Sequence, residues 1–274
     1  MSERRLYETH CHTPLCKHAV GEPEEYVEVA YRRRLRGITF TCHNPMPEGF
    51  SPHVRMAVGE LEQYIAMVRR AQEAWSGTMD VRLGIECDYL AGFESWLEEQ
   101  LGATDYSYVL GSVHPQTREF RDRHWTGDPL EYQRRYFGEL ANAAETGFFD
   151  TISHPDLVKN EVESTWSPDA ILDDIRRALD RIAATGVAME LNTSGANKVV
   201  PEMNPFPRML GEMNSRSIPV VIGADAHEPS RVADRFEDAL DLLEEVGYRR
   251  VSYVLDRRRH DVSIEEARRS LSGD

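Results

Sequence analysis

Six of the seven short apolar segments in this 274-residue chain end in a side chain that can bind a metal. The segments alternate with longer stretches of helical periodicity and predict β-strands. We place the strands at residues 6–12, 37–42, 81–87, 106–112, 149–153, 187–192 and 220–224, and treat 250–255 as a further candidate. The residues at the strand ends are His10 and His12, His43, Glu86, His114, His154, and Asp225 with His227. Any fold of this chain must accommodate these titratable groups next to buried strands.

The helical stretches between the strands indicate the fold class. They cover residues 24–34, 60–74, 94–100, 129–146, 168–185, 207–214 and 229–246. Seven or eight β-α units predict either a closed barrel or a doubly wound open sheet. In a barrel the carboxyl ends of all strands lie on one face, whereas an open sheet would keep its outermost strands apart. The ring of ligand-type residues therefore favours an α/β barrel, which we expect to form a single domain over residues 1–274.

The composition excludes several classes of protein. With 32 basic and 47 acidic residues the net charge is −15, which opposes binding to a nucleic-acid backbone. No apolar run approaches the roughly 20 residues of a membrane span, and the four cysteines form no CxxC pair. The arginine runs at 32–34 and 257–259 are expected to be solvated surface. We expect a soluble, cytoplasmic protein with reduced thiols that binds neither nucleic acid nor a membrane; its oligomeric state is not predicted.

Two acidic residues strengthen the prediction of a metal site. His10 and His12 lie two apart on an extended segment, so both side chains point to the same side and can grip one ion. Glu86 and Asp225 each follow an apolar strand, where a buried charge needs a partner. Salt bridges to arginines could explain either carboxylate singly. A cation explains the whole ring of residues better.

The remaining histidines and the cysteines are treated separately. His53, His124 and His260 stand in polar surroundings without a partner at ligand spacing, and we expect them to be exposed or structural. Cys11 and Cys87 directly adjoin proposed ligands, and strand alternation turns their side chains to the opposite side. We expect both to lie in the core. Cys16 and Cys42 stay open, because thiolates also bind zinc or iron.

Four motifs of the chain resemble those of the polymerase and histidinol phosphatase (PHP) superfamily of metal-dependent phosphoesterases. They are His10-Cys11-His12, Thr41-Cys42-His43-Asn44-Pro45, Gly111-Ser112-Val113-His114 with Ser153-His154-Pro155-Asp156, and Gly223-Ala224-Asp225-Ala226-His227. The segments 13–19 and 41–47 resemble the histidinol-phosphatase branch in particular. The resemblance covers nearly the whole chain and implies a distorted seven-stranded (β/α) TIM-like barrel that holds three metal ions.

The resemblance also implies which residues bind which ion. The first ion would be held by His10, His12, Glu86 and Asp225, and the second by Glu86 as a bridge together with His114 and His154. His18, His43 and His227 would hold the third. The ions would be zinc, iron or manganese, since histidine and carboxylate donors accept each of them. One position departs from the pattern, because relatives commonly have aspartate where this chain has Cys42, and the third ion's affinity and identity therefore stay open.

The implied activity is hydrolysis of a small phosphomonoester, specifically L-histidinol phosphate, to L-histidinol and phosphate in histidine biosynthesis. Glu86 and Asp225 would hold two ions that activate a bridging water as hydroxide, and Asp156 could protonate the leaving group or bind a substrate amine. Positive side chains in loops after strands are candidates for phosphate binding, namely Arg55, Lys159 and Lys198. Two alternatives stay open: a phosphoesterase acting on a phosphodiester, nucleotide or other small phosphate, and a non-catalytic metal-binding interaction domain.

Overall fold

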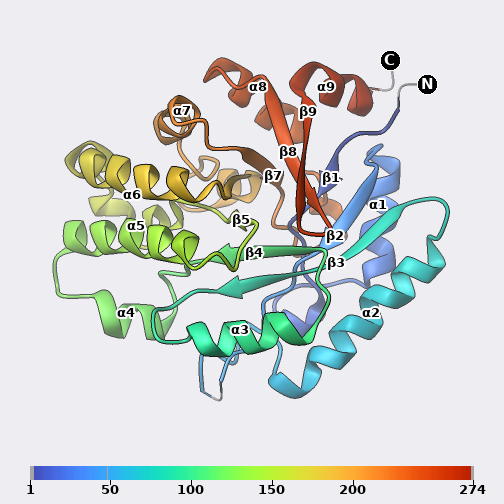
Figure 1. The fold of residues 1–274 in the computed structure, drawn as a ribbon, viewed down its shortest axis with the longest axis horizontal. Helices are drawn as coiled ribbons and strands as arrows, with labels where there is room; N and C mark the ends of the chain where they lie inside the picture. The colour runs from blue at the N-terminus through green and yellow to red at the C-terminus, as the bar shows by residue number, and fades with distance from the viewer. Residues whose placement is uncertain (1–2, 48, 273–274) are drawn as a thin grey trace.

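The computed structural model describes residues 3–47 and 49–272 and shows a barrel of parallel strands surrounded by helices (Figure 1). The barrel strands are β1 (Tyr7–Glu8), β2 (Gly37–Phe40), β3 (Asp80–Asp88), β4 (Tyr108–Ser112), β5 (Thr151–Ile152), β6 (Ala188–Asn192) and β7 (Val220–Gly223). They pair in sequence order, and each pair is parallel. A hairpin of β8 (Arg250–Leu255) and β9 (Arg258–Ser263) extends the sheet.

The barrel closes where the chain leaves β1 and β7. Backbone N–H of His12 donates to the Ala226 carbonyl at 2.9 Å, and the Ala226 N–H donates to the His10 carbonyl at 3.0 Å. Beside this junction β8 pairs with β7, and the Tyr253 ring stacks on Tyr7 with centroids 4.9 Å apart. The predicted TIM-like barrel is thereby confirmed, and β8 and β9 extend its sheet beyond β7.

A buried carboxylate holds this junction together. Glu8 on β1 is fully buried and accepts hydrogen bonds from four backbone N–H groups, those of Thr9, His10, Ala224 and Ala233, at 2.7–3.0 Å. Burial raises the pKa of Glu8 to about 7, and the four donors oppose that rise. The carboxylate thus fixes the backbone beside His10 and on the N-terminal side of Asp225.

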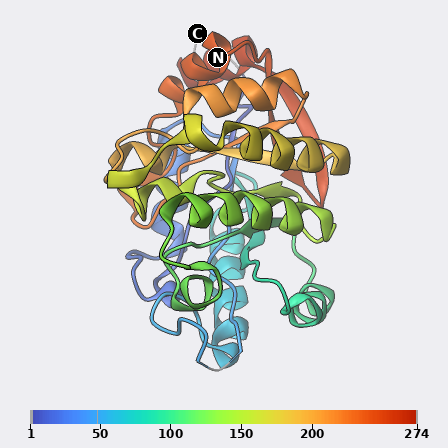
Figure 2. The same ribbon diagram turned by 90° about the vertical axis from the view of Figure 1, so that its left-hand side faces the viewer.

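Nine helices within the described residues complete the fold. They are α1 (Pro23–Arg32), α2 (Leu61–Ala74), α3 (Glu94–Ala103), α4 (Arg118–His124), α5 (Pro129–Glu145), α6 (Leu172–Thr185), α7 (Pro207–Ser215), α8 (Phe236–Glu245) and α9 (Ile264–Ser272). Figure 2 shows α5, α6 and α7 side by side as one layer over the strands. No described helix has both the length and the apolar composition that crossing a membrane requires.

Several predicted boundaries were wrong for local reasons. The helix predicted from residue 229 begins only at Phe236, because Ala233 and Arg235 have positive φ angles of 54° and 56° and the Ala233 N–H is bound by Glu8. The first residues of the helix predicted at 168–185 form a 3₁₀ turn, Pro168–Ile171, which has no side-chain cap and leads into α6. Gly186 ends α6 in the left-handed region at φ 76°, directly after the predicted end at residue 185. Helices α4 and α9 and strand β9 were not predicted. Of the exposed arginines 257–259, Arg257 lies in the turn before β9, and Arg258 and Arg259 begin the strand.

Gly111 on β4 provides a test of the packing between barrel and helices. A Cβ at this position would overlap the Phe149 ring, whereas a Cβ at Gly138 on α5 would meet nothing within 4 Å. We therefore expect Gly111→Ala to lower the free energy of unfolding by about 1–3 kcal/mol through overpacking. Gly138→Ala should raise it by about 0.5–1 kcal/mol through helix propensity. Urea denaturation of both variants measures the difference, and equal stabilities would contradict the packing.

Candidate metal centre

All nine predicted ligands lie at the end of the barrel that is formed by the carboxyl ends of the strands. His10, His12, Glu86 and His154 are buried, as are His43 and His114, while Asp225 and His227 are half-buried and His18 is exposed. His154 and Asp225 adopt positive φ angles of 25° and 50°, which turn the chain directly after β5 and β7. Such backbone angles are uncommon outside glycine and concentrate at functional sites.

The four proposed ligands of the first ion, which we call the first group, surround one point. The Nε2 atom of His12 lies 3.2 Å from Asp225 Oδ1 and 3.7 Å from Glu86 Oε2. The Nε2 atom of His10 lies 3.5 Å from Glu86 Oε2 and 3.6 Å from Asp225 Oδ1. Two ligands of a single ion with bonds of about 2.1 Å lie about 3.0–3.4 Å apart. Three of these separations are too long for good hydrogen bonds, and all four are close to those of ligands that share an ion.

Glu86 has the geometry of a bridge between two groups. Its Oε2 atom faces the first group, and its Oε1 atom lies 3.1 Å from His154 Nε2 and 3.6 Å from His114 Nε2. Burial alone would raise the pKa of Glu86, but His43 and His10 hold it well below its ordinary value. A carboxylate that stays ionised with one oxygen toward each group can join two cations.

The third predicted group is less regular than the other two. His18 and His227 stack at 4.5 Å between centroids, and each Nδ1 lies near a backbone carbonyl, that of Cys16 or Asp225, which leaves Nε2 available. His43 turns partly away from them, because its Nδ1 lies 2.8 Å from Glu86 Oε2. Ring nitrogens of His12, His43 and His227 still lie within 4.8 Å of one another.

Buried polar atoms without hydrogen-bond partners test whether the centre fits metal ions. Among the described residues they include both ring nitrogens of His12, Nε2 of His10 and His227, Nδ1 of His43, and Oε2 of Glu86. Leaving such atoms unsatisfied costs about 1–3 kcal/mol each. The donor set of imidazoles and carboxylates suits divalent cations such as zinc, iron or manganese. We conclude that the residues fit divalent metal ions.

The titration of the histidines agrees with a centre built for positive charge. Burial lowers the pKa of His43 to about 4 and that of His227 to about 2, so both are neutral, the form that binds a metal. Burial opposes a charge on His12 as well, but Asp225, Cys42 and Glu86 raise its pKa to about 9. A divalent ion that binds the carboxylates would displace that proton.

Glu190 on β6 orients His10 and was missed by the sequence analysis. Its Oε1 atom accepts from His10 Nδ1 at 2.7 Å, and its Oε2 accepts from the His154 N–H and from Asn192 Nδ2, each at 2.9 Å. Fixing Nδ1 in this way leaves Nε2 of His10 for the metal. The signal was an acidic residue inside an apolar strand, the same criterion that identified Glu86.

Asp88 is a second orienting carboxylate that the analysis missed. Its Oδ1 atom accepts from His114 Nδ1 at 2.5 Å, and its Oδ2 is paired with the Arg55 guanidinium. Burial would raise the pKa of Asp88, but Arg55 and His114 lower it. Its spacing of two from Glu86 on one strand was the available signal. Arg55 is only 3% exposed and also donates to the Asn44 carbonyl, so the structure gives it a supporting position behind His114.

The structure also gives Asp156 and Lys159 a packing role. Both side chains are fully buried. Asp156 accepts from Lys159 Nζ at 3.1 Å, from the Phe206 N–H at 2.8 Å and from Asn204 Nδ2. Lys159 donates further to the Met203 carbonyl at 2.9 Å. These contacts engage both the Asp156 carboxylate and the Lys159 ammonium group. The geometry therefore does not favour proton donation by Asp156 or phosphate binding by Lys159.

Lys198 lies where the prediction needs a phosphate ligand. Its Nζ atom is 3.7 Å from Asp225 Oδ2, and its side chain is 30% exposed. The same carboxylate oxygen accepts from Ser194 Oγ at 3.0 Å. Lys198 therefore stands beside the first group of ligands with its charge accessible from solvent.

The predicted core positions of Cys11 and Cys87 are confirmed, and Cys16 and Cys42, which the sequence left open, are buried as well. All four are free and fully buried. Cys42 Sγ accepts from Thr13 Oγ1 at 3.2 Å, and the sulfur atoms of Cys16 and Cys42 lie within 4.8 Å of each other and of a His12 nitrogen. Burial raises the pKa of Cys42, but hydrogen bonds from Cys16, His12 and Thr13 bring it well below its ordinary value. A thiol therefore occupies the position where the resemblance implies aspartate.

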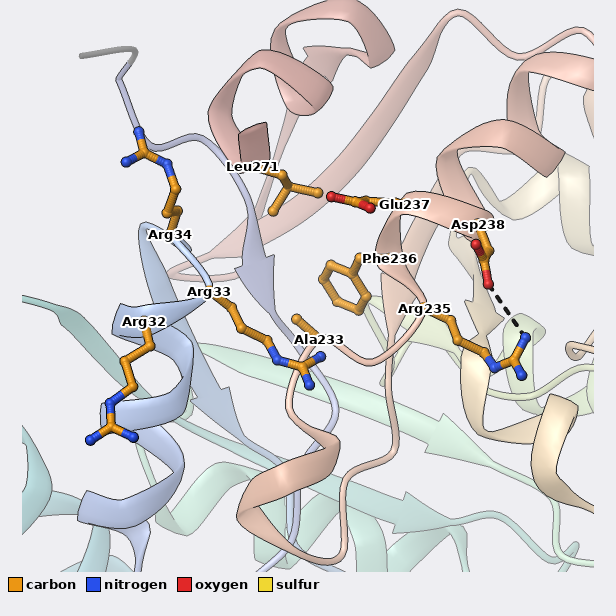
Figure 3. Close-up of a pocket in the computed structure, with 9 residues that line it drawn as sticks. All are labelled: Arg32, Arg33, Arg34, Ala233, Arg235, Phe236, Glu237, Asp238 and Leu271. Carbon is orange, nitrogen blue, oxygen red and sulfur yellow. Dashed lines mark hydrogen bonds and ion pairs between the residues drawn. The ribbon is translucent and has the colours of Figure 1, made fainter. Parts of the chain in front are cut away.

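The arginine run at residues 32–34 lines a separate cavity of about 320 Å³ between the end of α1 and the start of α8. Figure 3 shows the side chains of Arg32, Arg34 and Arg235 directed away from one another. Arg33 donates to the Ser230 carbonyl at 3.1 Å, and Arg235 pairs with Asp238. The charges do not converge on one point, which agrees with the prediction of solvated surface.

Comparisons with known proteins agree with this geometry. The model of the PHP domain family matches residues 8–194. A probable histidinol-phosphatase of Deinococcus radiodurans is 39% identical over 90% of this chain and 96% of its own length. The histidinol-phosphatase of Bacillus subtilis is 26% identical over 85% of this chain and 97% of its own. A Lactococcus lactis histidinol phosphate phosphatase, solved with zinc, L-histidinol and phosphate, has a similar fold with a TM-score of 0.78 at 17% identity, over 95% of this chain and 100% of that one.

Replacing Glu86 by glutamine tests the bridge. The amide removes the charge that offsets two cations and supplies one good ligand oxygen where a bridge needs two. We expect bound metal to fall and any metal-dependent hydrolysis to drop by at least about 100-fold. Metal analysis and phosphate release measure the two effects. The exposed Glu98→Gln on α3 is the matched control, and parental metal content in Glu86→Gln would refute the bridge.

Replacing Asp88 by asparagine tests the support of His114. The variant keeps the size of the side chain but loses the negative charge that faces His114 and Arg55. We expect metal affinity to weaken by about 10–100-fold, the usual effect of losing an orienting partner. A chelator titration monitored by metal release measures it, with the exposed Asp105→Asn as control. An unchanged affinity would show that His114 needs no such partner.

Proposed function

Because the chain belongs to the PHP domain family, we propose that it is a metal-dependent phosphomonoesterase that converts L-histidinol phosphate and water to L-histidinol and phosphate. The observation that carries this proposal is the convergence of nine ligand-type side chains, several with unsatisfied buried atoms, on one end of the barrel. The relatives named histidinol-phosphatase support the choice of substrate, and they match nearly the full length of this chain.

We assign the ions as three divalent cations, with zinc favoured. The zinc in the structurally similar Lactococcus lactis enzyme and the imidazole-rich donor set support this choice. When bound, the ions would polarise the phosphoryl group and activate water. They would also reverse the local field, which lets a protein of net charge −15 bind a phosphate dianion.

The chain's own residues would divide the remaining work. Glu86 and Asp225 would keep the centre anionic enough to retain the ions, and Glu190 and Asp88 would hold His10 and His114 in the ligating orientation. Lys198 would meet a phosphoryl oxygen beside Asp225. Arg55 would act on the substrate through Asp88 and His114, since its guanidinium is already paired.

Phosphate release from metal-replete protein tests the proposal. We expect hydrolysis of histidinol phosphate, loss of activity after chelation, and recovery on adding zinc. A phosphodiester such as bis(4-nitrophenyl) phosphate and a short oligonucleotide serve as comparisons. The proposal fails if either is preferred to histidinol phosphate by tenfold or more in kcat/KM, about 1.4 kcal/mol of discrimination. Full activity in the chelated, metal-free protein would contradict the metal-dependent reaction.

A further inference from the structure

A small cavity opens directly beside the proposed metal ligands. It has a volume of about 110 Å³, and His18, His43 and His114 form part of its wall. The rest of the wall comes from residues 51–55 and from residues 116–118, where α4 begins. A phosphoryl group held by ions at these histidines would direct the remainder of its substrate into this space.

Most polar side chains of this wall are already engaged. Ser51 Oγ donates to Glu119 at 2.5 Å, and Thr117 Oγ1 donates to the His114 carbonyl at 2.8 Å. Arg118 donates to the Gly49 carbonyl at 3.3 Å. These contacts fasten the 51–55 segment to the start of α4 and hold the wall in place.

Two polar side chains of the wall stay available. In the part of the chain that the structure describes, His53 and Gln116 take part in no side-chain hydrogen bond, ion pair or ring contact, and His53 is exposed. The sequence analysis left His53 outside the site, since it has no partner at ligand spacing. The folded chain brings it to the same cavity as three ligands that lie between 10 and 61 residues away.

We propose that His53 donates the proton to the leaving alcohol of a small alkyl phosphate. The proposal rests on the proposed function. An alkoxide is a poor leaving group, and a positioned acid typically accelerates its departure by about 10²–10⁴-fold. The buried Asp156 is occupied by three donors, whereas His53 lines the cavity that the leaving group would fill.

The proton balance of the step is simple. Water forms the new bond to phosphorus and releases one proton to solvent, while the bond from phosphorus to the alcohol oxygen breaks and that oxygen keeps the electron pair. The imidazolium of His53 gives its proton to this oxygen, and the exposed ring recovers a proton from solvent. The other charged or titratable groups of the cavity wall are His18, His43, His114, Arg55 and Arg118. The three histidines are assigned to metals, and both arginines are engaged by other residues.

Leaving groups of different quality test the proposal with the metal-loaded protein. His53→Gln keeps a polar side chain of similar size but cannot supply the proton, and the exposed His260→Gln on β9 is its control. The substrates are histidinol phosphate, ethyl phosphate and 4-nitrophenyl phosphate, whose nitrophenolate leaves without protonation. We expect kcat of His53→Gln to fall by about 10²-fold or more on both alkyl phosphates. It should stay within about threefold of the parent on 4-nitrophenyl phosphate, with unchanged metal content, and His260→Gln should match the parent throughout.

The outcomes separate this proposal from the proposed function. A loss on histidinol phosphate alone would assign His53 to recognition of that substrate and overturn proton donation. An equal loss on all three substrates, or no loss on any, would overturn it as well. If the parent hydrolyses ethyl phosphate but not histidinol phosphate, the proposed function fails while the His53 comparison still stands. A parent inactive on both alkyl phosphates would overturn both proposals.

Discussion

The buried Glu86 carboxylate is the constraint on which the rest of this structure depends. It lies fully buried at the end of β3 with imidazoles of five histidines within 3.7 Å of its two oxygens. An ionised carboxylate in such a place is costly unless positive charge faces it. Histidines that follow β1, β2, β4 and β5 could hold cations beside it only because these strands end on the same side as β3. The need to balance the negative charge of Glu86 is therefore consistent with the parallel arrangement of these strands.

A second set of buried carboxylates converts this arrangement into a rigid centre. Glu8 binds four backbone N–H groups at the junction of β1 and β7, Glu190 binds His10, and Asp88 binds His114. Each is close to a ligand but none is itself one of the nine proposed ligands. Orientation by such partners fixes which ring nitrogen faces the metal. The acidic excess of the chain is thus partly concentrated where cations are needed.

The sequence predicted the barrel and its ligand ring because both leave periodic signals. Apolar strands mark the barrel, and a histidine or carboxylate after a strand marks its carboxyl end. The orienting residues were harder to predict, since Glu190 and Asp88 lie in apolar strands as Glu86 does, but the sequence does not say which histidine each of them contacts. Lys159 was predicted to bind phosphate because it lies in a loop after a strand, but the chain there buries it against Asp156. His53 could not be linked to the site from the sequence. It lies in the segment after β2, and only the folding of that segment brings it to the cavity beside His18, His43 and His114.

Cys42 stands where the family resemblance implies aspartate, and the residues around it accommodate this substitution. Its sulfur replaces the carboxylate implied by the resemblance, and it lies between Thr13, Cys16 and His12, three residues of the segment that follows β1. A polarisable sulfur can accept hydrogen bonds as a carboxylate does, although more weakly when it is neutral. The segment that supplies His12 and His18 therefore also supplies the groups that surround the substituted position.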